Sequence, residues 1–78
     1  MHELGLCEGL LDAVERRAAG RKVLGVRFRV GEDHRVVGEA LDQAFAMLAA
    51  GTVAEGAEID LVQVPGDELT LESIRVAQ

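Results

Sequence analysis

The first three residues of this 78-residue chain, Met1, His2 and Glu3, carry nitrogen donors that could hold a metal ion. A free α-amine, the backbone nitrogen of His2 and the imidazole Nδ1 of the same residue can close two fused chelate rings on one ion. The amide nitrogen of Glu3 is the nearest candidate for a fourth ligand. Four nitrogens in one plane suit Ni(II) or Cu(II), whereas Zn(II) prefers a tetrahedron and Mg(II) or Ca(II) prefer oxygen. Because an α-amine has a pKa of about 7.7 to 8.0 and imidazole about 6.5, protons should weaken binding below about pH 6.5.

The element that must position these donors is a helix predicted over residues 4–17. Apolar residues recur there at helical spacing, so one face is expected to pack on a core. That stripe consists of Leu4, Cys7, Leu11, Val14 and Ala18. Gly20 is expected to end the helix. The candidate metal ligands are therefore joined directly to a packed element.

Residues 22–30 alternate as a strand does. We predict that Leu24, Val26, Phe28 and Val30 face the core, and that Val23, Gly25, Arg27 and Arg29 face away from it. Residues 31–35 are predicted as a loop. A second helix is predicted from residue 36 or 38 to about residue 50, with its apolar stripe at Val37, Leu41, Ala44, Phe45 and Leu48.

Two further strands are predicted over residues 58–64 and 69–76. The turn signal Pro65-Gly66-Asp67 lies between them and predicts that they pair with each other as antiparallel neighbours. The apolar positions of the last strand change phase, which predicts a bulge near Glu72 or Ser73.

These elements predict an α/β (α+β) fold in one domain over residues 1–78. Its order is helix-strand-helix-strand-strand, with two helices packed on one face of a three-stranded sheet. The other face would carry Arg27 and Arg29, and a partner or a second copy, forming a homodimer, could dock there.

Composition and charge argue against several kinds of partner and activity. The formal net charge is −6 and the chain has no Tyr or Trp, so nucleic acid is not expected as a partner and a basic partner fits better. No apolar run is long enough to span a bilayer, and Glu3, Glu8 and Asp12 interrupt the apolar residues that a signal peptide would need. We therefore expect a cytoplasmic protein without a membrane partner. No Ser/His/Asp or Cys/His arrangement is visible, so the protein is not expected to be an enzyme.

Two other side chains could bind metal. Cys7 lies on the apolar stripe and is expected to be a small buried hydrophobe, the alternative being a soft ligand or a reactive thiol. His34 is expected as a solvated loop residue, the alternative being an axial ligand to an ion at the N-terminus.

Several runs, in this order and spacing, resemble one known family. They are the opening residues 1–4, the runs Arg-Phe-Arg-Val-Gly-Glu at 27–32 and Val-Gly-Glu-Ala-Leu-Asp-Gln-Ala-Phe at 37–45, the segment at 50–57, and Gly-Asp-Glu-Leu at 66–69 ahead of Ser-Ile at 73–74. The chain is similar over nearly its whole length to the HypA/HybF family of hydrogenase nickel-incorporation proteins. The resemblance implies the two-helix, three-stranded fold, a Ni(II) cargo and a nickel site at Met1, His2 and Glu3. There the Glu3 carboxylate would tune the site or the partner contact.

The resemblance also implies partners and one departure. The partners would be a HypB-like GTPase and the large subunit of nickel-iron hydrogenase, with urease as a recipient in some members. Family members carry a zinc-binding domain with two Cys-x-x-Cys pairs, inserted where this chain has the turn at residues 65–67. All four cysteines are missing here, so no zinc is expected, whether the deletion is natural or engineered.

Two functions follow as hypotheses. The first is a nickel metallochaperone module that delivers Ni(II) for hydrogenase maturation. The second is a metal-independent interaction adaptor that docks on a maturation GTPase or a hydrogenase subunit, depending on Arg27, Arg29 or the acidic C-terminal third.

Overall fold

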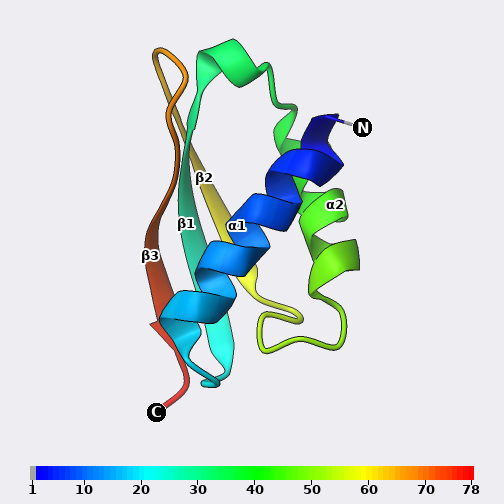
Figure 1. Cartoon of the computed structure of the whole chain (residues 1–78), viewed down its shortest axis with the longest axis vertical. Coiled ribbons are helices and arrows are strands. Elements are labelled where there is room, and N and C mark those ends of the chain that lie inside the picture. Colours follow the sequence, from blue (N-terminus) through cyan, green and yellow to red (C-terminus); the bar gives the residue numbers. More distant parts are fainter. Residues whose placement is uncertain (1) are drawn as a thin grey trace.

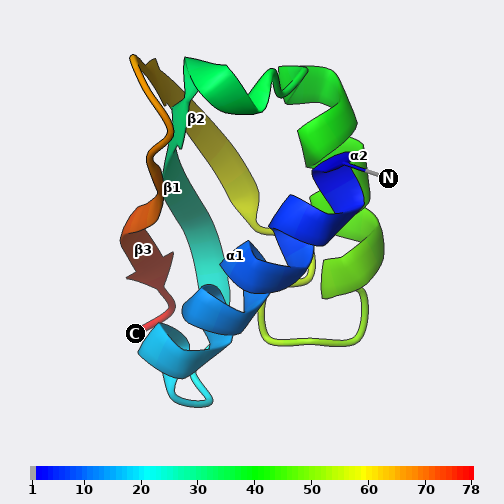
Figure 2. The same ribbon diagram turned by 45° about the horizontal axis from the view of Figure 1, so that its top comes forward.

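The computed structural model describes residues 2–78 and shows two helices covering one face of a three-stranded sheet (Figures 1 and 2). The elements are α1 (His2–Ala18), β1 (Val23–Gly31), the short 3-10 helix η1 (Glu32–His34), α2 (Gly38–Ala49), β2 (Glu58–Val64) and β3 (Leu69–Val76). The predicted fold class and element order are confirmed. The 3-10 helix η1 lies within the predicted loop.

Helix α1 is longer at its start than predicted and begins at His2. Its core-facing stripe is confirmed for Cys7, Leu11, Val14 and Ala18, which are buried, whereas Leu4 is only partly buried. The helix ends where Ala19 and then Gly20 adopt positive φ, which allows the Ala19 amide to donate to the carbonyl oxygen of Glu15 at 3.1 Å. The helix is therefore packed on the core from Cys7 to Ala18, and its first turn precedes this packed stretch.

Helix α2 packs through Leu41, Phe45 and Ala49, all buried. The rings of Phe45 and Phe28 meet edge to face, with their centroids 5.4 Å apart, and this contact joins the helical layer to the sheet. The prediction that Val37 lies on the buried stripe was wrong, because Val37 is the extended N-cap residue of the helix and its side chain is 61% exposed.

Strand β1 follows the predicted alternation from Val26 onward, with Phe28 and Val30 buried. The assignment of its first two residues was wrong. Val23 is fully buried and Leu24 is 43% exposed, because the pairing of β1 with β3 shifts register between Val23 and Gly25. A bulge of this kind moves every residue before it to the opposite face of the sheet.

The sheet order is β2-β1-β3, so the predicted antiparallel pairing of the last two strands was wrong. Strand β1 lies in the centre, parallel to β2 and antiparallel to β3. Helix α2 connects β1 to β2 as a crossover, as parallel neighbours require, and the most apolar strand thereby gains a neighbour on each side.

The turn at residues 65–67 therefore crosses the end of β1. It is held there by two backbone hydrogen bonds, from the Gly31 amide to the Glu68 carbonyl at 2.6 Å and from the Asp33 amide to the Gly66 carbonyl at 2.9 Å. A side chain at Gly31 would collide with the Gly66 carbonyl oxygen, so this crossing requires glycine.

The predicted bulge in β3 is confirmed. Arg27 pairs with Ser73 and Phe28 pairs with Leu71, so Glu72 has no partner in the register. The extra residue places the Glu72 carboxylate on the open face of the sheet, where it reaches Arg27 and Arg29.

Candidate metal site at the start of helix α1

The predicted metal ligands lie at the first turn of α1. Met1 lies outside the described residues, and so does the imidazole of His2. The backbone of His2 is the first residue of the helix, and Glu3 follows it with a partly exposed side chain. The coordination of a metal by Met1, His2 and Glu3 therefore stays a prediction.

The helical start determines which backbone groups are available as ligands. The first four amides of an α-helix have no partner within the helix. The amides of His2 and Glu3 are among these four, so a metal could replace their protons without breaking a helical hydrogen bond. The positive end of the helix dipole disfavours a cation, whereas loss of an amide proton and the Glu3 carboxylate both oppose that effect.

The second turn of α1 packs against α2 through Cys7. Leu4 is partly buried and Cys7 is fully buried, and the Cys7 thiol donates to the carbonyl oxygen of Leu41 across a distance of 3.6 Å. Burial raises the pKa of Cys7 to about 11, with smaller contributions from the negative charges of Glu3 and Asp42. The thiol is protonated at neutral pH, so Cys7 acts as the buried hydrophobe that was predicted.

His34 does not lie free in the solvent. Its Nε2 is 2.9 Å from the carbonyl oxygen of Asp67, to which it donates, so the ring holds the turn that crosses the end of β1. The alternative role of His34 as an axial metal ligand has no support in this contact. Among the side chains that the structure describes, no group of three or more His, Cys, Asp or Glu residues could hold a metal ion.

The open face of the sheet carries the arginines that were predicted as a docking surface, and both form ion pairs. Arg27 Nε lies 2.7 Å from Asp60 Oδ2, and Arg29 Nε lies 2.9 Å from Glu68 Oε2. Hydrogen bonds to these carboxylates, that of Asp60 being the largest influence on Arg27, raise the pKa of each arginine. An adaptor that docked through Arg27 or Arg29 would first have to displace these carboxylates.

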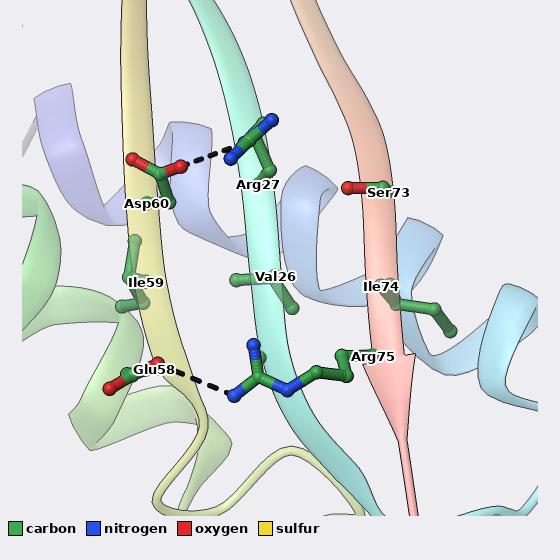
Figure 3. Close-up of a pocket in the computed structure, with 9 residues that line it drawn as sticks. Val26, Arg27, Glu58, Ile59, Asp60, Ser73, Ile74 and Arg75 are labelled. Atoms are coloured by element: carbon green, nitrogen blue, oxygen red, sulfur yellow. Dashed lines mark hydrogen bonds and ion pairs between the residues drawn. The ribbon is translucent and has the colours of Figure 1, made fainter.

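Figure 3 shows that this pattern of ion pairs continues along the sheet face. The guanidinium of Arg75 extends across β1 and lies 3.3 Å from the carboxylate of Glu58. A depression of about 500 Å³ lies between this pair and the Arg27–Asp60 pair, and Gly25 is among the residues that line it. Its charged walls are paired with one another, so it offers a ligand no unmatched charge.

Sequence reasoning missed a second hollow beside the candidate metal site. It is a groove of about 360 Å³ between the start of α1 and the outer side of α2, lined by Glu3, Leu4, Ala40, Gln43, Ala44 and Met47. The spacing of residues 40, 44 and 47 was the available signal, because these positions share one helical face. Met47 is 66% exposed and was not singled out, since an isolated exposed Met is ordinary.

Comparison with known proteins shows which class of protein this chain belongs to. A family model described as hydrogenase/urease nickel incorporation, metallochaperone, matches residues 1–74. A metallochaperone binds a metal and hands it over without catalysing a reaction, which agrees with the prediction that the protein is not an enzyme. The chain belongs to this family, the HypA family, as its resemblance indicated.

Curated relatives agree with this assignment. The chain is 39% identical over 66 residues to a hydrogenase maturation factor HypA of Geobacter sulfurreducens, covering 85% of this chain and 60% of the relative. It is 42% identical over 69 residues to hydrogenase maturation factor HypA 2 of Bradyrhizobium diazoefficiens, covering 85% and 61%. A HypA of Legionella pneumophila is 33% identical over 72 residues, covering 88% and 64%.

The chain thus spans a little over three fifths of the length of these relatives. Within residues 2–78, neither helix has the length and apolar character needed to cross a bilayer.

Proposed function

We propose that this chain binds one Ni(II) ion at its N-terminus and delivers it for the maturation of nickel-iron hydrogenase. Three donors come from the α-amine of Met1 and from the amide nitrogen and Nδ1 of His2. The fourth position is filled by Glu3 or by the recipient protein. Because only three of the four donors must come from Met1 and His2, the ion can be handed over by exchange of the fourth donor.

The observation that carries this proposal is the start of α1 at His2 in a chain of the nickel-incorporation family. The amides of His2 and Glu3 have no helical acceptors to lose. The contact of Cys7 with Leu41 holds the next turn of α1 against α2. Donors that are held in place in this way lose less entropy when they converge on a metal.

The partners are proposed on the resemblance. They are a HypB-like GTPase and the large subunit of the hydrogenase, acting in the cytoplasm, with urease as the alternative recipient that the family description includes. The 78 residues contain a single cysteine, so they cannot supply a four-cysteine zinc site, and nickel delivery by this chain is proposed to proceed without zinc.

Calorimetric titration of nickel into the protein with a free Met1 amine tests the proposal. We expect one Ni(II) per chain, a loss of affinity of at least about tenfold in His2→Ala, and a similar loss when residues are added before Met1. His34→Ala is the matched control, because it removes the other histidine and should leave nickel affinity unchanged. Equal affinity of the wild type and His2→Ala would reject the proposal.

The pH dependence supplies a second signature of the same site. Lowering the pH from about 7.5 to about 6 should weaken nickel binding at least about tenfold, because protons compete for the amine and the imidazole. The absorption spectrum should show the d-d band of a planar nitrogen site at the higher pH and lose it at the lower pH. A spectrum that does not change with pH would exclude the amine and the imidazole as ligands.

A further inference from the structure

The groove between the start of α1 and α2 is an open apolar surface directly beside the candidate metal site. Leu4 contributes from α1, and Ala40, Ala44 and Met47 contribute from α2. The start of α1 lies beside α2 in both views of the ribbon (Figures 1 and 2). The groove therefore depends on the packing of the two helices and is not a feature of either alone.

Met47 gives the groove its adaptable wall. It is the most exposed of the large apolar side chains that the structure describes, at 66%. Its position on α2 follows Ala40 and Ala44 at helical spacing, so a narrow row of small side chains ends at a long flexible thioether. A methionine in this setting can mould itself around apolar side chains of different shapes, as it does at many peptide-binding surfaces.

Charge determines what kind of partner would fit. The groove is walled by Glu3, and the exposed side of α2 carries Glu39 and Asp42. The sequence has no Lys or Arg in residues 1–15 or 36–74, which include the start of α1 and all of α2. The negative charges of Glu3 and Asp42 both raise the pKa of the buried Cys7 thiol, so both carboxylates lie near the contact between α1 and α2.

We propose that this groove docks a protein segment that presents an apolar side chain flanked by Lys or Arg. The apolar side chain would lie against Leu4 and Met47, and the flanking cations would lie near Glu3, Glu39 and Asp42. Anionic lipid and nucleic acid would be repelled by the same carboxylates. The inference rests on the proposed function for its purpose, since a segment docked here would lie next to the metal ligands at the moment of transfer.

A binding experiment with a defined probe tests the docking site. The probe is a fluorescent amphipathic peptide of about 14 residues with Leu on one helical face and Lys on the other, measured by anisotropy. A matched peptide has Glu in place of every Lys. We expect the Lys peptide to bind the full chain and the Glu peptide to bind at least about tenfold more weakly.

Two substitutions separate the groove from general charge attraction. Met47→Lys places a cation in the groove, and Val37→Lys makes the same charge change at an equally exposed apolar residue outside it. We expect Met47→Lys to weaken binding of the Lys peptide at least about tenfold and Val37→Lys less than about twofold. Equal weakening by the two variants would overturn the proposal, as would equal binding of the two peptides. Met47→Gln, which keeps the charge and approximate size, should also weaken binding more than Val37→Gln, whether or not Met47→Lys folds.

Nickel titration of the same variants separates this proposal from the proposed function. Met47→Lys is expected to bind Ni(II) as the wild type does. Nickel binding without peptide binding would overturn the docking site alone. Peptide binding that responds to Met47→Lys, in a protein that does not bind nickel, would support the docking site and reject the nickel site.

Discussion

The start of α1 beside α2, called the helical end below, differs from the open face of the sheet in how its charges are paired. On the sheet, Arg27, Arg29 and Arg75 each meet a carboxylate from a neighbouring strand. At the helical end, Glu3 and Asp42 lie beside an apolar groove, in stretches of the sequence (residues 1–15 and 36–74) that contain no Lys or Arg. The arginines of the sheet face are paired within the chain, whereas the groove at the helical end is lined by Glu3 with no Lys or Arg among its lining residues.

Docking of a partner on the sheet face stays a prediction, and the ion pairs of Arg27 and Arg29 would have to open for it. Arginines on a strand suggest a docking site in the sequence, but carboxylates beside them reduce the net positive charge that the face presents to a partner. The docking groove that we propose lies where acidic side chains adjoin apolar ones. Exposure of charged residues alone does not identify it.

The largest expected effect is the difference in stability between a core substitution and a surface substitution in α2. Leu41 is fully buried on the inner side of α2, so Leu41→Ala should lower the free energy of unfolding by about 2 to 5 kcal/mol. Met47→Ala on the same helix should change it by less than about 0.5 kcal/mol, because Met47 is mostly exposed and has little packing to lose. Urea denaturation of both variants measures the difference. Equal losses would mean that Met47 is packed within the chain, and the groove would then not be open.

Glycine-to-alanine substitutions should have smaller effects on stability, and these effects should differ between the two regions. Gly5 and Gly9 lie in α1 with open space around an added Cβ, so Gly5→Ala and Gly9→Ala should each stabilise the chain by about 0.5 to 1 kcal/mol. On the sheet, a Cβ at Gly25 would approach Arg75 Nη1 to 3.0 Å. Gly25→Ala should therefore displace that side chain and bring no comparable gain. Thermal denaturation of the three variants tests this, and a loss of stability in Gly5→Ala would show that its surroundings are not open.

The smallest expected effect concerns acid stability of the sheet face. Hydrogen bonds from Arg29 and then Thr70 lower the pKa of Glu68 below its ordinary value of 4.5. A carboxyl whose folded pKa is lowered adds stability above its unfolded pKa and loses it as the pH falls through the folded value. The wild type should therefore lose slightly more stability than Glu68→Gln as the pH falls below about 4.5. Melting curves between about pH 6 and pH 3 measure this, and parallel curves would show that the Arg29 pair adds nothing.

The fold could be predicted from the sequence because periodic apolar residues report which side of an element is buried. This worked for the stripe of Cys7, Val14 and Ala18 and for Phe28 and Val30 in β1. It failed at Val23 and Leu24, because a bulge inverts the alternation and is created by pairing with a strand far along the chain. Strand order failed for a related reason. A turn signal says that the chain reverses, but it does not say whether another strand will lie between the two arms.

One part of the candidate site could likewise be predicted from the sequence, and another part could not. The donor types at Met1, His2 and Glu3 are a property of consecutive residues, so the sequence alone could suggest a metal and a family. The groove could not be predicted, because Leu4 and Met47 become neighbours only when α1 packs against α2.

The sequence by itself determined the two helices, the three strands, the buried side of most of them and the presence of nitrogen donors at the N-terminus. These depend on local periodicity and on covalent neighbours. The tertiary structure alone decided that β1 lies between β2 and β3, that the sheet arginines are paired and that the acidic groove is open. Each of these depends on which distant residues meet, and the free energy of those contacts is not encoded in any single stretch of the chain.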